Sequence, residues 1–234
     1  MTTKLAKEIL ESLSTGSSEE RIAFTERVSP TKMEVLGITM PYLKEVLKNF
    51  LPIAKELSQE ESEELLQELV SCGVFEMQLF AYCWLDKDKK LLKNLKRDTL
   101  LGLKGKLDNW VSVDYYGTLV IGPMWFRGEL MLDDIKKFQG SRDFWLRRLA
   151  LCACIGWDRV ITKKEQNNPH YKEIVLNALS DRHPKIIQAL SWVLRFHIPR
   201  KRGEVISIVE LNRQHIADKV LREVHNKLDT GLKN

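Results

Sequence analysis

The 234-residue sequence contains few cysteines and shows no metal-binding pattern. Its four cysteines, Cys72, Cys83, Cys152 and Cys154, are too few and too irregularly spaced for a disulfide framework in a chain of this length. Cys152 and Cys154 lie in an apolar run without a second cysteine or histidine pair at ligand spacing. We therefore expect reduced cysteines in the core and no metal site.

The sequence also lacks long apolar segments. The stretch from Met1 to Ser18 interrupts its apolar positions with charged residues, which does not fit a signal peptide. Nothing elsewhere approaches the roughly 20 consecutive apolar residues that a membrane-spanning helix needs. These absences favour a cytoplasmic protein.

Several sequence signatures of catalysis are missing as well. The chain has no Walker A loop, no dinucleotide-binding fingerprint, no HExxH motif and no helix-hairpin-helix element. Gly102-Leu103-Lys104-Gly105 lacks the strand and loop context of a phosphate-binding turn. We expect no cofactor, and we expect the scattered histidines to be structural or exposed; these are His170, His183, His197, His215 and His225.

What the sequence does contain is a basic balance of charge. The formal net charge is +5, which makes a polyanionic partner plausible without proving it. One basic run extends from Lys87 to Lys106, and Arg195, Arg200, Lys201 and Arg202 form a second cluster. Solvated helix faces explain either run equally well when it is taken alone.

Apolar residues recur at three- and four-residue spacing, which predicts helices almost throughout the chain. The most periodic segments are 42–51, 61–70, 75–85, 145–155, 186–198 and 206–228. Start signals agree: Pro41 suits a first helical turn, Ser58 with Glu61 resembles a capping box, and Asp181 precedes an entry at His183-Pro184. The sequence therefore predicts an all-α fold.

Glycines at helix-stop or turn positions divide the chain into segments of one or two helices. These are Gly16, Gly37, Gly73, Gly102, Gly122, Gly140 and Gly203. Segments 76–81, 145–150 and 186–191 look alike, at offsets compatible with helical repeats of about 35 to 45 residues. We expect one domain over residues 1–234 whose HEAT-like repeats stack into a curved, C-shaped solenoid with a concave basic groove, completed by helices within 204–230. An irregular helical bundle is the alternative.

Three short segments combine aromatic and charged side chains. Trp110 and Asp114 stand at positions i and i+4, hence on one face of a helix. Taken alone, this pair is more simply a core tryptophan with an exposed or capping aspartate. Segments 145–148 and 191–195 each place a tryptophan near arginine, and arginine suits phosphate because its planar fork donates parallel hydrogen bonds. For Trp145 itself we expect core packing, with Arg148 able to point outward.

These segments together resemble the AlkD-like DNA glycosylases. That family has a Trp followed by Ser-Val-Asp, then Trp-Leu-x-Arg, then Trp-Val-Leu-Arg, which residues 110–114, 145–148 and 192–195 match in order. Leu36-Gly37-Ile38 followed by Pro41 is similar to an early family element. The resemblance covers roughly residues 20 to 200. The sequence departs from the family at Asn109, where an aromatic is expected, and after Pro41, where paired arginines are common.

The resemblance implies a stack of helical repeats that cradles duplex DNA and removes cationic alkylated purines, such as N7-methylguanine and N3-methyladenine. By analogy, Asp114 is the catalytic carboxylate, Trp110 and Trp192 flank the sugar-phosphate of the lesion, and Arg148 holds the DNA backbone. The family acts without a base-specific pocket, and none is indicated here. Further DNA contacts are expected from other polar side chains: Thr39, Lys44, Lys48, Arg147 and Arg195. Such an enzyme would be a monomer in the bacterial cytosol or nucleoid.

The chemistry is consistent with these roles. An alkylated purine already carries positive charge, so its glycosidic bond breaks without a strong general acid. Charge then develops on the sugar as an oxocarbenium ion, which a carboxylate and electron-rich indole faces stabilise. Two alternatives remain: a catalytically inactive repeat protein that binds distorted or branched DNA, and an armadillo-like scaffold for protein partners.

Overall fold

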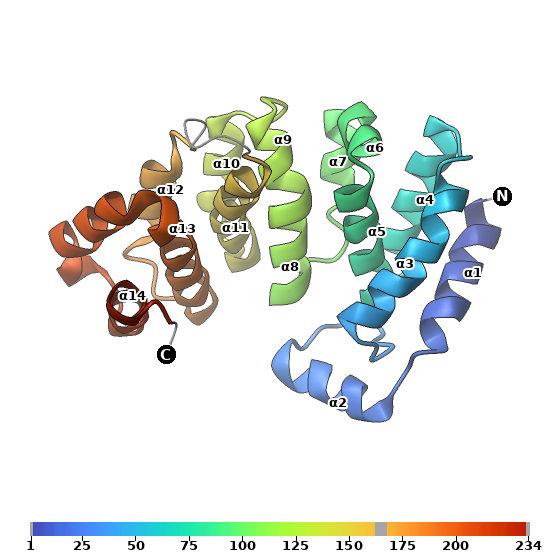
Figure 1. Cartoon of the computed structure of the whole chain (residues 1–234), viewed down its shortest axis with the longest axis horizontal. Coiled ribbons are helices and arrows are strands. Elements are labelled where there is room, and N and C mark those ends of the chain that lie inside the picture. The colour runs from blue at the N-terminus through green and yellow to red at the C-terminus, as the bar shows by residue number, and fades with distance from the viewer. Residues whose placement is uncertain (1, 162–167, 233–234) are drawn as a thin grey trace. The chain divides into compact units, whose positions relative to one another are not determined.

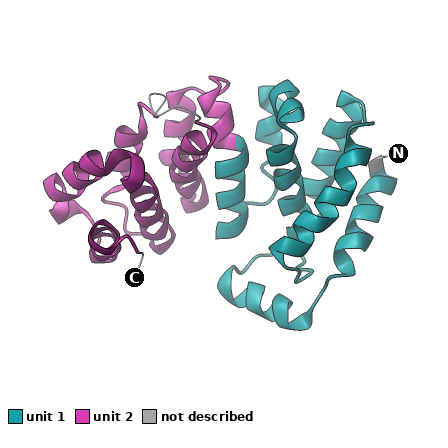
Figure 2. Ribbon diagram, in the orientation of Figure 1, with its two compact units in different colours: residues 1–120 teal, residues 121–234 magenta. Residues whose placement is uncertain are grey.

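The computed structural model describes residues 2–161 and 168–232, and these residues form helices joined by loops and turns (Figure 1). Within these residues the one extended pairing is an isolated bridge between Glu34 and Val74. The all-α prediction is therefore confirmed. The chain divides into two compact units, residues 1–120 and 121–234 (Figure 2). The repeat architecture, the curved solenoid and the basic groove stay predictions.

Unit 1 is built around α5 (Phe75–Lys87), in which every side chain from Phe75 to Leu85 is buried. Trp84 meets the ring of Phe50 edge to face, with ring centroids 5.1 Å apart. Helices α3, α4 and α8 pack against α5, which explains why its sequence is apolar on all sides. The other helices of this unit are α1 (Thr2–Ser14), α2 (Glu19–Val28), α3 (Met40–Ala54), α4 (Gln59–Ser71), α6 (Lys89–Asn94), α7 (Arg97–Gly102) and α8 (Trp110–Tyr116). A π-helical turn, Gly117–Ile121, follows α8.

Unit 2 is built around α11 (Phe144–Val160), which packs against α9, α10, α12 and α13. A Cβ added to Gly122 would lie 2.4 Å from the backbone of Gly156, so α9 and α11 cross in close contact. Trp125 packs edge to face on Trp157. The remaining helices are α9 (Gly122–Phe126), α10 (Leu132–Gln139), α12 (Tyr171–Ala178), α13 (Pro184–Leu211), a 3-10 turn (Arg213–His215) and α14 (Asp218–Thr230).

The predicted helix starts are confirmed. Ser58 and Glu61 form the predicted capping box at α4, and Pro41 lies in the first turn of α3. Helix α13 begins at the predicted entry, where His183 is the N-cap and its ring accepts the backbone N–H of Lys185. Asp181, which precedes this entry, accepts the N–H of His183.

The C-terminal part of the chain differs more from the predicted pattern. Gly203 does not end a helix, because α13 continues to Leu211 and its one non-helical position is Lys201, two residues after Pro199. Residues 206–228 are not one helix, since residues 212–217 separate α13 from α14. Periodicity alone did not detect this break, because Ile216 is buried at a spacing that also fits a helix.

The cysteines agree in part with the prediction. None of the four cysteines, all of which the structure describes, forms a disulfide: Cys83, Cys152 and Cys154 are buried, whereas Cys72 is exposed, because it follows the last turn of α4. Among the described residues, no group of three histidine, cysteine or acidic side chains is arranged to hold a metal ion. In the same part of the chain, every helix is too short or too polar to cross a bilayer.

Candidate nucleic-acid site

The start of α8 is fixed by polar side chains that precede Trp110. Asn109 is the N-cap: its side-chain oxygen accepts the N–H of Ser112 at 2.9 Å, and its amide donates to the Ser112 hydroxyl at 3.0 Å. An aromatic residue at position 109 could not supply these bonds. The departure from the family pattern at Asn109 therefore has a structural role, which is to set where α8 begins.

Asp108 ties the same point to the loop between α2 and α3. Its carboxylate accepts the hydroxyl of Thr31 at 2.6 Å and the backbone N–H of Lys32 at 2.8 Å. Burial alone would raise the pKa of Asp108, but these two hydrogen bonds, with those of Asn109 and the charge of Lys106, hold it below its usual range. Residues almost eighty positions apart are thus joined where Trp110 begins its helix.

Trp110 is half-buried, and a hydrogen bond to α2 fixes its indole ring. Its indole N–H donates to the carbonyl of Val28, the last residue of α2, at 2.9 Å. The ring lines a cavity of about 170 Å³ within unit 1. Apolar side chains dominate the lining: Phe24, Val28, Ile38, Met40, Leu43, Phe75, Leu79 and Val111. A small apolar cavity thus lies beside the tryptophan, although no pocket was indicated by the sequence.

The rim of this cavity is aromatic and cationic. Phe24 is 42% exposed and has the guanidinium of Arg21 5.1 Å from its ring centroid and that of Arg27 at 5.7 Å. The Nε atom of Arg21 is buried without a hydrogen-bond partner. An exposed ring between two guanidiniums suits contact with a base or sugar beside phosphate. The sequence pattern does not single out Phe24, because the residues of α2 show no strong apolar periodicity.

Glu76 forms the acidic wall of the same cavity. Its two carboxylate oxygens accept the backbone N–H groups of Leu36 and Gly37, both at 2.9 Å. Gly37 has a φ of 71°, and a Cβ there would collide with Ile22, so glycine is required. The early family element is therefore a turn clamped by a buried carboxylate. The signal that sequence reasoning overlooked is one glutamate inside an apolar helix.

Asp114 lies one helical turn after Trp110 on α8, as its spacing predicted. It is 8% exposed, and its backbone carbonyl accepts the hydroxyl of Thr118 at 2.7 Å. The helix widens into the π-helical turn three residues later. Such turns inside helices occur often at functional sites because they re-aim nearby groups.

The first turns of α3 carry three further predicted contacts. Thr39 is the exposed N-cap of α3, and its hydroxyl accepts the N–H of Tyr42 at 3.3 Å. Lys44 and Lys48 are exposed and, being four residues apart, share a face of the helix. Met40, between Thr39 and Lys44, lines the cavity of Trp110. Unit 1 therefore brings Thr39 close to the tryptophan.

Unit 2 holds the predicted arginines in its interior contacts. Arg148 is only 4% exposed, and its guanidinium donates to the carbonyl of Lys185 at 2.6 Å, so it does not point outward as expected. Arg147 forms an ion pair with Asp181 at 2.7 Å and donates to the carbonyl of Ser141. Both arginines thus fix the entry of α13, where helix packing turns their side chains toward the protein.

Trp145 is half-buried instead of lying in the core. Its ring lies 4.6 Å from that of Phe144, which in turn stacks on His183 at 3.9 Å. Three rings therefore gather where α11 starts and α13 is capped. The core interpretation holds for the later part of α11, from Leu149 to Ile155, where the side chains are buried.

Trp192 and Arg195 are brought together on α13. Both line a cavity of about 440 Å³ in unit 2, with Phe196, Pro199, Arg200 and Lys227. Arg195 donates to the hydroxyl of Ser191 at 3.1 Å and pairs with Glu223 at 3.5 Å. Burial lowers the pKa of Arg195, and the nearby charge of Glu223 opposes that effect. The half-buried indole of Trp192 thus lies beside cationic side chains.

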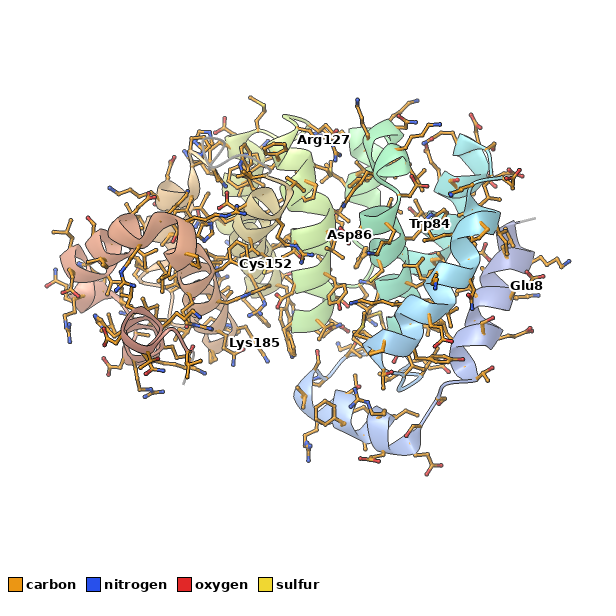
Figure 3. All side chains as sticks on the ribbon, viewed as in Figure 1. Glu8, Trp84, Asp86, Arg127, Cys152 and Lys185 are labelled. Carbon is orange, nitrogen blue, oxygen red and sulfur yellow. The ribbon has the colours of Figure 1, made fainter. Side chains whose placement is uncertain are left out.

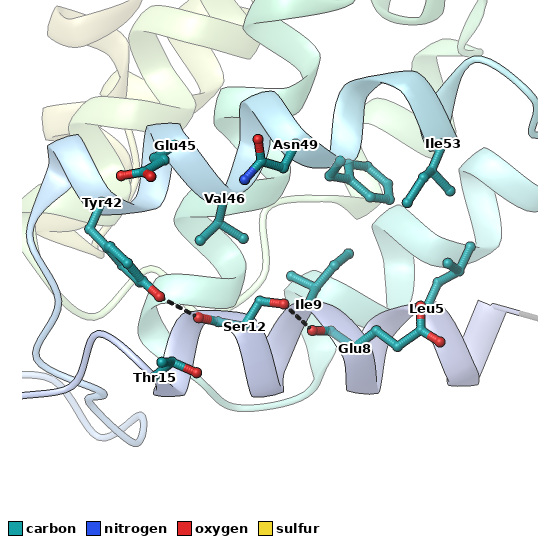
Figure 4. Close-up of a pocket in the computed structure, with 11 residues that line it drawn as sticks. Leu5, Glu8, Ile9, Ser12, Thr15, Tyr42, Glu45, Val46, Asn49 and Ile53 are labelled. Carbon is teal, nitrogen blue, oxygen red and sulfur yellow. Dashed lines mark hydrogen bonds between the residues drawn. The ribbon is translucent and has the colours of Figure 1, made fainter.

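The groove between α1 and α3, of about 390 Å³, contains none of the predicted site residues (Figure 4). Tyr42 crosses it to donate its hydroxyl to the carbonyl of Ser12 at 2.8 Å. Glu8 and Glu45 lie along it, which disfavours phosphate. We therefore describe two candidate sites separately, one at Trp110 in unit 1 and one at Trp192 in unit 2.

The class of protein follows from a comparison of the chain with known protein families. The family described as DNA alkylation repair enzyme matches residues 9–228. The chain therefore belongs to that family, as its resemblance indicated, and DNA alkylation repair is its function at this level. No curated protein is similar enough to match the chain.

Proposed function

We propose that the protein is a DNA glycosylase that hydrolyses the N-glycosidic bond of cationic alkylated purines in duplex DNA. The observation that carries the proposal is the geometry of α8. Trp110 is fixed beside an apolar cavity by its bond to Val28, and Asp114, which is 8% exposed, follows one turn later on the same helix. Membership of the DNA alkylation repair family supports duplex DNA as the substrate.

In the proposed reaction, the bond between the sugar C1′ and the purine nitrogen breaks, and its electron pair neutralises the positive charge of the base. Asp114 stabilises the oxocarbenium ion that forms on the sugar and orients water. Water then adds to C1′ and loses a proton. One well-placed electrostatic contact of this kind is worth about 100-fold in rate. No cofactor is needed because the alkylated base is already a leaving group.

The other site residues have supporting roles in the proposal. Trp110 and Trp192 offer electron-rich faces to the sugar-phosphate and the cation. Arg148 contributes by holding the carbonyl of Lys185 at the start of α13, the helix that carries Trp192. Thr39, Lys44, Lys48, Arg147 and Arg195 contribute contacts to the phosphate backbone.

Release of free base from methylated duplex DNA tests the proposal. The wild type, Asp114→Asn and the control Asp229→Asn are compared under single-turnover conditions, with DNA binding followed in parallel. Asp229 is an exposed residue of α14, so its substitution makes the same chemical change on the surface. We expect Asp114→Asn to release base at least about 100-fold more slowly while still binding DNA. Binding without release by the wild type would instead identify an inactive DNA-structure binder.

A further inference from the structure

Unit 1 contains a second large cavity, far from Trp110 along α5. Its volume is about 820 Å³. It is lined by the end of α3, the start of α4, the end of α5 and α6: Leu51, Ala54, Lys55, Leu57, Ser58, Gln59, Ser62, Lys87, Asp88, Lys90, Leu91 and Asn94. We call it the lysine groove. None of the predicted site residues lines it.

Three exposed ammonium groups dominate the charge of the lysine groove. Lys55, Lys87 and Lys90 form no ion pair with any residue that the structure describes. The nearby Lys89, by contrast, pairs with Asp86, which Figure 3 labels on the last turn of α5, at 2.7 Å. The three groove lysines therefore keep their charge available for a ligand.

The lining of the lysine groove contains fewer carboxylates than lysines. Asp88 is the one carboxylate in the lining, and it caps α6 by accepting the N–H of Leu91 at 2.9 Å. Glu60 and Glu61 lie in the first turn of α4, where Glu61 accepts the N–H of Ser58 in the capping box. The lining therefore carries the positive charges of Lys55, Lys87 and Lys90 against the one negative charge of Asp88, which favours an anion.

The kind of anion follows from what else lines the groove. No aromatic ring is among the lining residues, so it offers no surface on which unpaired bases could stack. Lysine binds phosphate as a point charge without reading base edges. Hydroxyl and amide groups of Ser58, Gln59 and Asn94 add hydrogen bonds of the kind that phosphate oxygens accept. These features fit a sugar-phosphate backbone.

The groove is separate from the candidate site at Trp110. Glu76, in the wall of the Trp110 cavity, and Lys87 lie at opposite ends of α5, which puts about 16 Å of helix between them. The basic run continues past the groove on the exposed residues Lys93, Lys96 and Arg97. A phosphate held here is therefore not the phosphate beside Trp110.

We propose that the lysine groove is a second DNA-backbone contact that is independent of sequence and of damage. Its phosphate contacts hold the protein on undamaged duplex DNA while the site at Trp110 contacts successive nucleotides. The inference rests on the DNA-binding part of the proposed function and not on catalysis.

The test measures binding of unmethylated duplex DNA by fluorescence anisotropy between 50 and 200 mM salt. The triple variant Lys55→Ala, Lys87→Ala, Lys90→Ala is compared with a control, Lys7→Ala, Lys172→Ala, Lys219→Ala, which removes the same charge from other exposed positions. Each lost phosphate contact makes the slope of log affinity against log salt shallower by about 0.9. We expect the groove variant to lose about 2 to 3 from the slope, and the control much less.

A second variant separates charge from folding. Replacing the three lysines by arginine keeps the charge, so it should restore the wild-type slope, and thermal unfolding checks that all variants are folded. Equal slopes for the groove variant and the control would overturn the proposal. Binding of polyglutamate is measured with the same variants. Weaker polyglutamate binding by the groove variant, with unchanged DNA affinity, would also overturn the proposal, because that result identifies an acidic protein partner. The assay needs no base release, so failure of the glycosylase proposal would be seen separately.

Discussion

Removing His197 should destabilise unit 2 strongly, because its side chain forms a buried ion pair. His197 on α13 hydrogen-bonds Asp158 on α11 through Nε2, and both side chains are fully buried. Its Nδ1 lies 2.7 Å from the carbonyl of Val193, which can only accept, so Nδ1 carries a hydrogen. Nε2 faces the Asp158 carboxylate, so both ring nitrogens have a partner in the buried contact between α11 and α13.

The size of the effect follows from what each substitution leaves behind. His197→Ala leaves a buried carboxylate without its main partner, which costs about 3 to 5 kcal/mol. Asp158→Asn should cost about 1 kcal/mol or less, because the new amide can donate to neutral His197 and still accept the N–H of Asn168. His225→Ala is the control: His225 pairs with Glu210 at the surface, where such pairs are worth about 0 to 1 kcal/mol.

The contact between His197 and Asp158 also predicts that the stability of the folded protein depends on pH. Burial alone would raise the pKa of Asp158, but the hydrogen bond and charge of His197 and the charge of Lys201 hold it below its usual value. The pKa of Asp158 is lower in the folded protein than in the unfolded chain, where it is about 3.9, so its ionised form stabilises the folded state at pH values above about 3.9. This stabilisation is lost as the pH falls through the pKa of the folded state. The stability advantage of the wild type over Asp158→Asn should therefore shrink below about pH 4.

Urea unfolding of the wild type and the three variants measures these differences, with hydrogen exchange of the α11 and α13 amides assigning the loss to unit 2. His197→Ala should lower the protection of both helices. A loss in His197→Ala no larger than that in His225→Ala would refute the reasoning, because the buried pair would then be worth no more than the exposed one.

Three further substitutions test the architecture of the two units. Glu76→Gln keeps one acceptor for the Leu36–Gly37 turn but replaces the other by an N–H donor, so one backbone N–H is left without an acceptor. Urea unfolding should then show a loss of about 1 to 3 kcal/mol. Gly122→Ala forces a methyl group against the backbone of Gly156, which should cost about 1 to 3 kcal/mol and lower the Tm; an unchanged Tm would contradict the close crossing. Asn109→Ala removes the N-cap of α8, so the free energy of unfolding should fall by about 0.5 to 2 kcal/mol and base release should be slower. Full activity of this variant would show that the cap does not position Trp110.

The sequence by itself determined the helical class, several helix starts and the position of Trp110 and Asp114 on one face of a helix. These features are local: a capping box needs residues three apart, and a shared helix face needs residues four apart. The order of the tryptophan motifs also identified the family that residues 9–228 match. None of this required knowledge of how the helices pack.

Only the tertiary structure decided which way the charged side chains point and what they touch. Helical spacing allowed Arg148 to face outward, but the approach of α13 brings the carbonyl of Lys185 within hydrogen-bond distance and buries the guanidinium. Glu76 lies inside an apolar helix, and its two hydrogen-bond donors come from the turn at Gly37, about forty residues away. Such partners come from distant parts of the chain, and a buried charge is tolerated only where they meet it, so the sequence pattern around each residue could not reveal them.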